Sequence, residues 1–338
     1  MPLIKENHSL KNLNTFGIDV NAKYFVEAHH VEDLQAIFES PIVKEQAVLI
    51  LGGGSNMLFT KDYEGLIVRM NILGIEVEQQ DTEVWVTAGA GEVWNNLVSY
   101  CVEHGFAGIE NLTLIPGTVG ASPIQNIGAY GVEIKDVFAS CEAFETATGL
   151  VRTFSPEECG FGYRESVFKN ELKGKYIITS VTYKLSTKPN LKTHYGAINA
   201  ELERRNIQQP SISDISEVVA AIRVSKLPDP KTIGNAGSFF KNPIITKAQF
   251  DSLFQKFPEV AHYPAPNNKV KLAAGWLIEQ CGFKGVVDGQ TGTWKNQALV
   301  LVNHGHATGD EVYRFSEKII DTVQHKFAVN LEREVNIF

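Results

Sequence analysis

A glycine-rich loop follows the first long apolar run of the chain. The segment Gly52–Asn56 contains three glycines, a serine and an asparagine, directly after the apolar run 47–51. Glycines allow successive backbone N–H groups to turn towards an anion such as a pyrophosphate. The dinucleotide-binding pattern, in which such a loop opens a helix, is absent, because Met57 begins another apolar run. A plain tight turn explains this loop equally well.

A second irregular segment, residues 115–131, is unusually rich in glycine, proline, serine and asparagine. A long irregular segment inside a compact domain often has a binding function. Two such loops in the first half of the chain favour a large anionic, dinucleotide-like ligand that backbone amides hold.

Three polar side chains could take part in chemistry, although their own sequence context does not single them out. Arg164 could bind a carboxylate through two hydrogen bonds, and the small residues around Ser238 leave its hydroxyl accessible. Glu334 lies in an alternating C-terminal segment. Taken singly, such an arginine is usually in a surface ion pair, such a serine in a turn, and such a glutamate solvated. His304 and His306 have no third ligand nearby, so an exposed turn is favoured over a metal site.

The composition limits the classes of function. With 338 residues the chain is long enough for two or three domains. Its formal net charge of −8 argues against nucleic acid or an anionic membrane as a partner. Scattered cysteines fit buried thiols in a reducing compartment rather than disulfides or zinc. No apolar run reaches the roughly 20 residues of a membrane helix, and no secretory signal is visible, so we expect a cytoplasmic protein.

Apolar periodicity predicts the elements that would position these residues. Strands are expected at 47–51, 65–70, 83–88, 176–185, 298–302 and 331–337, and helices at 92–104, 215–224, 272–280 and 310–327. The last of these helices has one apolar stripe, from Val312 to Phe327. Two prolines in the segment 226–230 exclude a helix there and indicate a domain junction.

Seven segments, in this order, resemble motifs of the UDP-N-acetylenolpyruvoylglucosamine reductase family. These segments are 14–17, 52–56, 116–131, 162–166, 226–228, 235–243 and 331–335. The likeness extends over nearly the whole chain, and the order makes it specific. The segment Tyr130–Glu133 resembles the longer of the family's two subtypes, in which a loop with a tyrosine covers the substrate.

The resemblance implies an α+β fold that begins with an FAD-binding fold of the vanillyl-alcohol oxidase and p-cresol methylhydroxylase type. Two α+β subdomains are expected at 1–70 and 71–225, a C-terminal α+β substrate-binding domain at 226–328, and a C-terminal strand at 329–338 that returns to the active site. The FAD would be noncovalent, since the two loops contain neither histidine nor cysteine. The implied cofactor-binding residues are Gly52, Gly53, Gly54, Ser55, Asn56, Pro116, Gly117, Gly120, Ser122, Ile127, Gly128 and Arg223.

The implied reaction is the reduction of UDP-N-acetylglucosamine enolpyruvate to UDP-N-acetylmuramate in peptidoglycan synthesis, with FAD as mediator and NADPH as hydride donor. An enol ether is a poor hydride acceptor, so the neighbouring carboxylate must be stabilised and a proton supplied. The resemblance gives Arg164 the first role and Ser238 the second. Glu334 would hydrogen-bond the developing acid if protonated, or orient its neighbours if not. The implied substrate-binding residues are Tyr130, Tyr195, Lys226, Asn242, Tyr263, Lys271, Lys284 and Gln297.

Two other functions remain open at this level. One is an oxygen-using flavin oxidase of the same fold that acts on an alcohol or sugar; it would need a base, and usually a flavin tethered to histidine or cysteine. The other is a non-enzymatic carrier of flavin or nucleotide, in which Arg164, Ser238 and Glu334 would be incidental. For the reductase we expect a monomer that binds the UDP-sugar and NADPH, and neither nucleic acid nor membrane.

Overall fold

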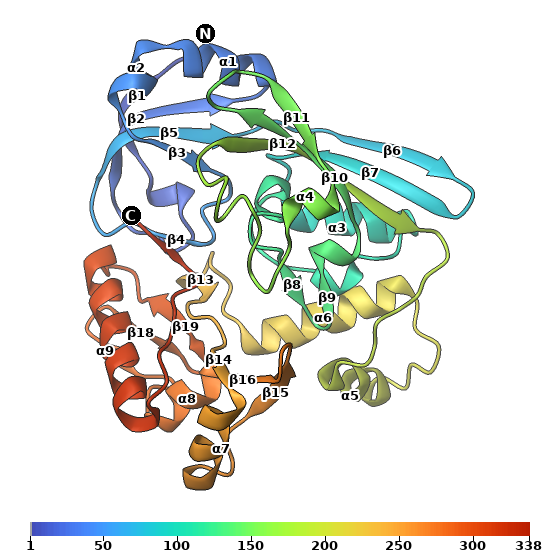
Figure 1. The fold of residues 1–338 in the computed structure, drawn as a ribbon, viewed down its shortest axis with the longest axis vertical. Helices are drawn as coiled ribbons and strands as arrows, with labels where there is room; N and C mark the ends of the chain where they lie inside the picture. Colours follow the sequence, from blue (N-terminus) through green and yellow to red (C-terminus); the bar gives the residue numbers. More distant parts are fainter. Residues whose placement is uncertain (1) are drawn as a thin grey trace. The chain divides into compact units, whose positions relative to one another are not determined.

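The computed structural model describes residues 2–338, which form two compact units (Figure 1). Unit 1 contains the chain up to His8 together with Ala22–Gly53 and Glu64–Arg223. Unit 2 contains Ser9–Asn21, Gly54–Tyr63 and Val224–Phe338. The four-part division expected from the sequence stays a prediction.

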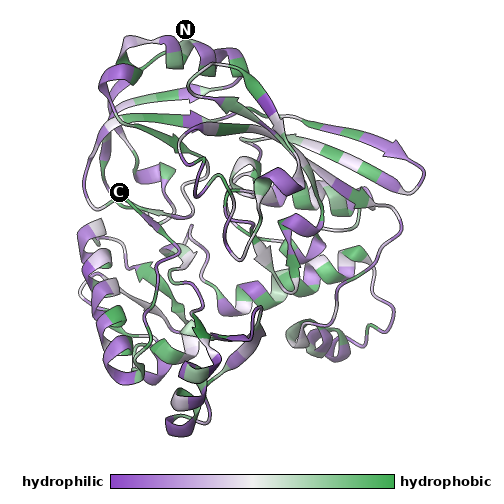
Figure 2. Cartoon of the chain, in the orientation of Figure 1, coloured by the Kyte–Doolittle hydropathy of each residue, from purple (hydrophilic) through white to green (hydrophobic). Residues whose placement is uncertain are grey.

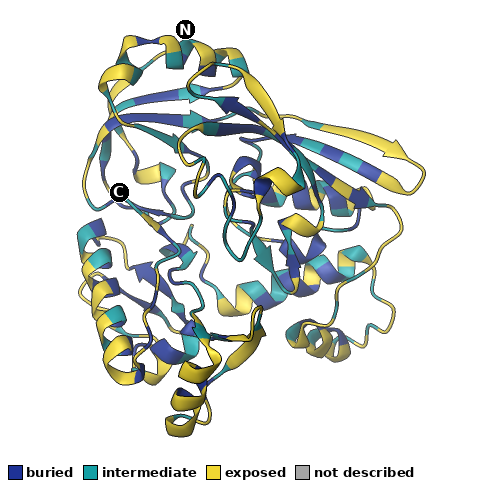
Figure 3. Ribbon diagram, in the orientation of Figure 1, coloured by how far each residue is buried: buried dark blue, intermediate teal, exposed yellow. Residues whose placement is uncertain are grey.

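Unit 1 is built on two sheets. The first has the order β1-β2-β5-β3, from Lys5–Ser9, Asn21–Ala28, Tyr63–Met70 and Val48–Leu51, and is accompanied by helices α1 (Val31–Glu39) and α2 (Pro41–Glu45). The second is antiparallel, with the order β11-β10-β12-β7-β6, from Val151–Phe154, Phe138–Glu145, Tyr176–Ser186, Glu83–Gly89 and Ile75–Gln80. Nearly all of β6 is exposed (Figure 3).

The remaining elements of unit 1 are short or helical. They are α3 (Trp94–Glu103), α4 (Pro156–Cys159), α5 (Gly196–Arg204), α6 (Ile212–Lys226), the hairpin of β8 (Gly128–Ala129) and β9 (Val132–Glu133), and the 3-10 turns η2 (Glu110–Leu112), η3 (Val119–Ala121) and η4 (Ile134–Asp136). The end of α6 crosses from unit 1 into unit 2 along the chain.

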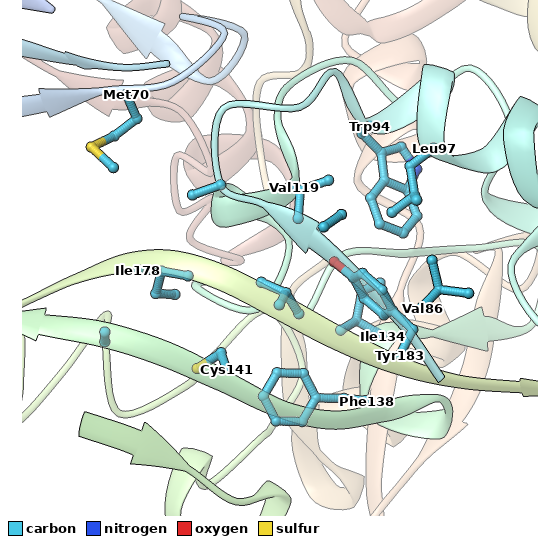
Figure 4. Close-up of a cluster of buried hydrophobic side chains, with 14 of the residues drawn as sticks. Met70, Val86, Trp94, Leu97, Val119, Ile134, Phe138, Cys141, Ile178 and Tyr183 are labelled. Atoms are coloured by element: carbon cyan, nitrogen blue, oxygen red, sulfur yellow. The ribbon is translucent and has the colours of Figure 1, made fainter. Parts of the chain in front are cut away.

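The main core of unit 1 includes side chains of α3 and of the five-stranded sheet, and it continues to the first sheet, as Met70 of β5 shows (Figure 4). Trp94 of α3 contacts Tyr183 of β12 edge to face, with ring centroids 5.7 Å apart. Val119 of the second glycine-rich segment belongs to the same buried cluster. The core therefore fixes that segment directly, because one of its own side chains is part of the packing.

Unit 2 contains two sheets with the orders β13-β19-β18-β17 and β14-β16-β15, and the parallel pair β20-β4. The first consists of Gly234–Ser238, Gln297–Asn303, Thr291–Trp294 and Val287–Asp288, the second of Ile244–Thr246, Lys269–Leu272 and His262–Ala265, and the pair of Asn336–Ile337 and Met57–Leu58. The helical elements are η1 (Lys11–Leu13), α7 (Lys247–Lys256), α8 (Ala274–Gln280) and α9 (Gly309–Phe327). Hydrophobic and hydrophilic residues alternate along α9 (Figure 2), and its predicted apolar stripe is buried.

Most of the predicted elements are confirmed, with two corrections. The run 331–337 is wrong as a regular strand, because only Asn336–Ile337 forms one, and Arg333 makes an isolated bridge to Phe240. The helix predicted at 272–280 begins at Ala274, since Leu272 ends the strand β16. The segment 115–131 is irregular as expected, apart from η3 and β8.

Candidate active site

Within unit 1, the start of the first glycine-rich loop lies against the second loop. A Cβ on Gly53 would lie 3.0 Å from the Cα of Gly117, and a Cβ on Gly52 would lie 2.6 Å from the Thr118 hydroxyl. Only glycine lets the two backbones approach this closely. Two loops that expose backbone in one place fit a ligand with a pyrophosphate, so this observation supports an FAD site here.

The second loop is also fixed to the start of α3. The Trp94 N–H donates to the Gly117 carbonyl over 3.0 Å, and the Gly120 N–H donates to the Ala90 carbonyl over 2.9 Å. Ser122 is fully buried, and its hydroxyl hydrogen-bonds the Tyr183 hydroxyl at 2.7 Å. The hydroxyl of Ser122 therefore anchors the loop to β12, while Pro116, at the start of the loop, is exposed.

The turn that carries Arg164 is docked on the second loop. The Arg164 guanidinium donates to the Gly128 carbonyl over 2.9 Å, and the Ser166 hydroxyl donates to the Ile124 carbonyl over 2.6 Å. The side-chain amide of Asn126 donates to the Gly162 carbonyl over 3.0 Å. Arg164 and the loop predicted to hold the flavin are thus neighbours within unit 1.

The backbone of Arg164 is unusual. Gly162 and Glu165 exchange backbone hydrogen bonds, so Tyr163 and Arg164 form the centre of a tight turn. Arg164 has a φ of +58°, a conformation that glycine and asparagine favour in turns. A residue held in such a conformation stores strain, and such positions cluster at functional sites.

Three further predicted residues form one cluster in unit 1. The ring of Tyr130 contacts that of Tyr195 edge to face, with centroids 5.3 Å apart. The Tyr130 hydroxyl hydrogen-bonds the Arg223 guanidinium. Burial raises the pKa of Tyr130, against the opposing effect of the charge on Arg223, and burial lowers the pKa of Arg223. Half of Tyr195 is exposed, so the cluster has an open aromatic side.

In unit 2, a β-bulge presents Ser238. Asn235 of β13 lies opposite Val302 of β19, and Ser238 lies opposite Val300, so β13 contains one extra residue between them. Gly237 has a φ of +67° at this point, and its N–H donates to the side chain of Asn235 over 3.0 Å. A bulge of this kind redirects the following side chain, here that of Ser238.

The segment around Glu334 lies beside the residues that follow Ser238. The Glu334 N–H donates to the Phe239 carbonyl over 2.9 Å, and the Lys241 N–H donates to the Glu332 carbonyl over 2.8 Å. Asn56 donates from its side chain to the Glu334 carbonyl over 3.2 Å. Unit 2 thus brings Ser238, Glu334 and the end of the first glycine-rich loop into one place.

The other residues of that loop pack on the segment 14–17. The Thr15 N–H donates to the Gly54 carbonyl over 3.1 Å, and a Cβ on Gly54 would collide with the Leu13 carbonyl. Ser55, the next residue of the loop, is partly buried. The first motif, 14–17, is therefore in contact with Gly54 of the loop within unit 2, although the two lie far apart in the sequence.

The predicted substrate-binding residues of unit 2 fall into separate groups. Tyr263 and Lys271 are paired across β15 and β16, with the Lys271 ammonium 5.9 Å from the centre of the Tyr263 ring. The side chain of Asn242 accepts the Ala274 N–H at the start of α8 over 2.9 Å. Gln297 also lies at this end of α8, because a Cβ on Gly275 would be 2.8 Å from its side-chain oxygen.

Two predicted lysines lie at the surface of unit 2. Lys226 is exposed at the end of α6. Lys284 forms an exposed ion pair with Glu279 at 2.8 Å. An exposed ion pair of this kind contributes little to stability and is common in the absence of a ligand. The role of both lysines stays a prediction.

Two buried asparagines that are not among the predicted site residues support the site. Asn126 and Asn235 hold the Arg164 turn and the Ser238 bulge through hydrogen bonds to the main chain. A polar residue within an irregular or glycine-rich segment was the available signal. Among residues 2–338, no cluster of three or more histidine, cysteine, aspartate or glutamate side chains could hold a metal ion.

None of the helices formed by residues 2–338 is long and apolar enough to cross a membrane. Cys101, Cys141 and Cys159 are buried, Cys281 is partly buried, and all four are free thiols, as the sequence predicts. His304 and His306 are exposed and lie in a bend rather than in a regular element.

Comparison with known proteins identifies the class of the chain. Residues 22–155 match the family model described as an FAD binding domain, and this range contains both contacting loops of unit 1. The chain is therefore a flavoprotein that binds FAD. Residues 229–338 match the model described as the C-terminal domain of UDP-N-acetylenolpyruvoylglucosamine reductase.

Sequence similarity to known reductases extends over nearly the full length of the chain. The chain is 52% identical over 337 residues to the UDP-N-acetylenolpyruvoylglucosamine reductase of Flavobacterium johnsoniae, with 99% of each chain covered. It is 48% identical over 328 residues to that of Chromobacterium violaceum, with 96% of each covered. The chain belongs to the UDP-N-acetylenolpyruvoylglucosamine reductase family of oxidoreductases.

A solved structure supports the fold. The reductase of Thermus caldophilus matches with a TM-score of 0.68 at 24% identity, and the match covers 100% of this chain and 99% of that one. At this identity the likeness concerns the fold alone. The expected α+β architecture, with an FAD-binding part and a C-terminal reductase part, is confirmed.

Proposed function

We propose that this protein reduces UDP-N-acetylglucosamine enolpyruvate to UDP-N-acetylmuramate, with NADPH as the hydride donor, in peptidoglycan synthesis. The observation that carries the proposal is the bulge at Gly237, which presents Ser238 beside the Glu334 segment in a chain of a reductase family. A flavin oxidase would need a base at this place, whereas a serine hydroxyl is a proton donor.

The loops around Gly53 and Gly117 would hold the FAD pyrophosphate, because both expose backbone where they touch. Gly128 and Ile127, which lie on the same segment as Gly117, would extend the site along the cofactor. Once bound and reduced by NADPH, FAD would supply hydride to the methylene carbon of the enolpyruvyl group.

Arg164 would bind the carboxylate of the enolpyruvyl group. Negative charge develops on that carboxylate as the double bond is reduced, so a fixed guanidinium stabilises the transition state more than the substrate. The hydrogen bond to the Gly128 carbonyl holds one end of the guanidinium in place, which limits the reorganisation required during reaction.

Ser238 would donate the proton to the carbon next to the carboxylate, and its oxygen would regain a proton from solvent. The hydroxyl is a weak acid in water, but the enolate-like species that accepts the proton is a strong base, so the transfer is favourable. Glu334 would assist from the neighbouring segment, by hydrogen-bonding the developing acid or by orienting Ser238.

The family resemblance assigns contacts with the sugar nucleotide to Tyr130 and Tyr195 in unit 1 and, separately, to Tyr263 and Lys271 in unit 2. An aromatic ring can pack against a sugar or base, and a lysine can bind a phosphate as a point charge. The sugar nucleotide is also the proposed ligand of the remaining residues, Lys226, Asn242, Lys284 and Gln297. We further propose a monomer in the cytoplasm, where a reducing environment keeps the four thiols free.

The direct test is flavin spectroscopy under anaerobic conditions. We expect the purified protein to be yellow, to release its flavin in acid, to bleach with NADPH, and to regain its colour when the enolpyruvyl sugar nucleotide is added. Colourless protein, or recovery of colour with oxygen and an alcohol but not with the sugar nucleotide, would refute the proposed function.

The role of Ser238 has its own test. In Ser238→Ala, bleaching by NADPH should continue at the wild-type rate, while reduction of the sugar nucleotide should fall by about a hundred- to ten-thousandfold, the usual contribution of a general acid. Ser252→Ala, which changes an exposed serine of α7 in the same unit, should leave both steps unchanged. Equal losses in the two steps of Ser238→Ala would rule out proton donation.

A further inference from the structure

Asn111 is a buried amide that connects two segments far apart in the chain. It lies in the 3-10 turn η2 and is 1% exposed. Its side-chain nitrogen donates to the Tyr130 carbonyl over 3.1 Å and to the Lys192 carbonyl over 2.9 Å. A primary amide has two N–H groups, so the two carbonyls use the full donor capacity of the side chain.

The two acceptors belong to the segments that carry the aromatic pair of unit 1. Tyr130 is itself one member, and Tyr195 lies three residues after Lys192. The two rings contact each other edge to face at 5.3 Å. Tyr130 also has a φ of +50°, a conformation that surrounding contacts must maintain. Asn111 therefore holds the main chain at Tyr130 itself and, three residues before Tyr195, the segment that leads to the second ring.

The orientation of the Asn111 amide follows from its partners. Exchange of the amide nitrogen and oxygen would place an oxygen against two carbonyl oxygens, which is repulsive. The side-chain oxygen is buried and accepts no hydrogen bond from residues 2–338. A buried acceptor without a donor is destabilising, so packing alone would favour an apolar residue of similar size. What the asparagine contributes is the pair of donors.

The turn that carries Asn111 is held on both sides. The Trp94 indole N–H donates to the Leu112 carbonyl over 3.0 Å. The Thr113 hydroxyl donates to the Glu110 carbonyl over 2.7 Å and lies 2.8 Å from the Ser216 hydroxyl of α6. The turn under Asn111 is therefore connected to both α3 and α6, and α6 also carries Arg223, the partner of the Tyr130 hydroxyl.

We propose that Asn111 is a positioning residue for the sugar-nucleotide substrate. Its two hydrogen bonds hold Tyr130 and Tyr195 as one preformed aromatic pair before the substrate binds. Preorganisation of this kind strengthens binding, because the ordering of the two segments is complete in the free protein. The proposal rests on the proposed function for the identity of the substrate, and on the structure for the connection itself.

The kinetic test uses the FAD-loaded Asn111→Ala and Asn111→Asp variants. We expect the KM for the enolpyruvyl sugar nucleotide to rise by about tenfold in Asn111→Ala, while kcat changes by less than about twofold. Bleaching of the flavin by NADPH and the FAD content should stay at wild-type levels. A loss of kcat without a change in KM would overturn the proposal.

Asn111→Asp adds a measurement that a general structural defect would not affect. Its carboxylate would face two carbonyl oxygens without a proton to donate, and protonation would restore one donor. The KM of this variant should therefore fall as the pH is lowered from about 8 to about 6, more than the KM of Asn111→Ala does. Equal pH dependence in the two variants would count against the donor role.

A substrate-free measurement separates this inference from the proposed function. Backbone hydrogen exchange in residues 128–133 and 190–196 should be faster in Asn111→Ala than in wild type. Ser40→Ala is the matched control, because it removes a buried hydrogen bond of 2.6 Å to the Ile37 carbonyl elsewhere in unit 1. This control should change neither that exchange nor KM.

The outcomes can be told apart. Wild-type protein that never turns over the sugar nucleotide refutes the proposed function, while the exchange result still decides whether Asn111 holds the two segments. Wild-type exchange and wild-type KM in Asn111→Ala overturn the positioning role. Failure of both Asn111 variants to fold, with Ser40→Ala folded, would show that Asn111 serves the fold alone, which also overturns the proposal.

Discussion

At the scale of single residues, Arg164 combines backbone strain with a proposed role in catalysis. Its φ of +58° in the turn Gly162–Glu165 would suit asparagine or glycine better. Strain of this kind is worth on the order of 1 kcal/mol, and the hydrogen bond from Arg164 to the Gly128 carbonyl contributes about the same in the opposite direction. The guanidinium also lies 5.5 Å from the centre of the Tyr163 ring, a cation–π contact worth about 0.5–1 kcal/mol at an exposed site, so the net contribution of the arginine to stability is small and favourable.

This balance gives a prediction for Arg164→Asn. The free energy of unfolding should stay within about 1 kcal/mol of the wild-type value, because the relief of strain offsets the lost hydrogen bond. Reduction of the sugar nucleotide should fall by about a hundredfold or more, since the carboxylate loses its cation. Urea denaturation and the two flavin half-reactions measure these quantities. A loss of several kcal/mol in stability would show that Arg164 is mainly structural.

The site residues that could be predicted from the sequence differ in kind from those that could not. Arg164, Ser238 and Glu334 could be proposed because their motifs occur in one family's order along the chain. Three asparagines, Asn111, Asn126 and Asn235, hydrogen-bond backbone carbonyl or N–H groups. Some of these partners are distant in the sequence, as Lys192 is from Asn111. A main-chain partner has no residue type, so the sequence alone carries no signal for such a contact.

At the scale of elements, too, structure that local sequence determines could be predicted, and structure that depends on distant segments could not. The apolar stripe of α9 predicted a helix correctly, since periodicity is a local property. The alternation in 331–337 predicted a regular strand and was wrong over most of its length. Leu331 and Val335 are buried as the alternation requires, but the main chain of Glu332 and Glu334 bonds to Lys241 and Phe239, which belong to no continuous partner strand.

Helix α3 allows a prediction about alkaline pH. Cys101 lies on its buried face, and burial, together with the negative charge of Glu110, raises the pKa of this thiol from about 9 to about 12. The folded state therefore binds the thiol proton more tightly than the unfolded state. This contribution to stability is complete below about pH 9 and is lost as the pH rises towards 12, by up to about 1.4 kcal/mol per pH unit.

In Cys101→Ala, we expect the free energy of unfolding to fall less steeply with pH than in wild type over that alkaline range. Urea denaturation at a series of pH values gives the two slopes. Cys281→Ala is the control and should keep the wild-type slope, because this thiol is only partly buried and the charge of Lys326 opposes the rise in its pKa that burial causes. Parallel slopes for wild type and Cys101→Ala would mean that ionisation of Cys101 does not limit alkaline stability.

At the scale of the whole molecule, the family could be recognised because its motifs extend along the whole chain. The sequence did not show which segments make up each unit, because unit 2 includes Ser9–Asn21 and Gly54–Tyr63 in addition to the C-terminal part. The contact between Thr15 and Gly54 illustrates the reason, since neither residue has an apolar pattern that points to the other. Local periodicity finds elements, and only the assembled backbone shows which elements pack together.

The cofactor should stabilise the molecule as a whole. A ligand that binds only the folded state adds about 2.7 kcal/mol to the free energy of unfolding at a hundredfold excess over its dissociation constant, so FAD should raise the Tm of the apoprotein by several degrees.

Gly53→Ala should lose most of this gain in Tm, because the new Cβ would lie 3.0 Å from the Cα of Gly117 and force the two loops apart. Gly196→Ala, where a Cβ meets no atom within 4 Å, should keep it. Thermal unfolding of each apoprotein with and without FAD measures the gain, and an equal gain in Gly53→Ala and wild type would place the pyrophosphate away from these loops.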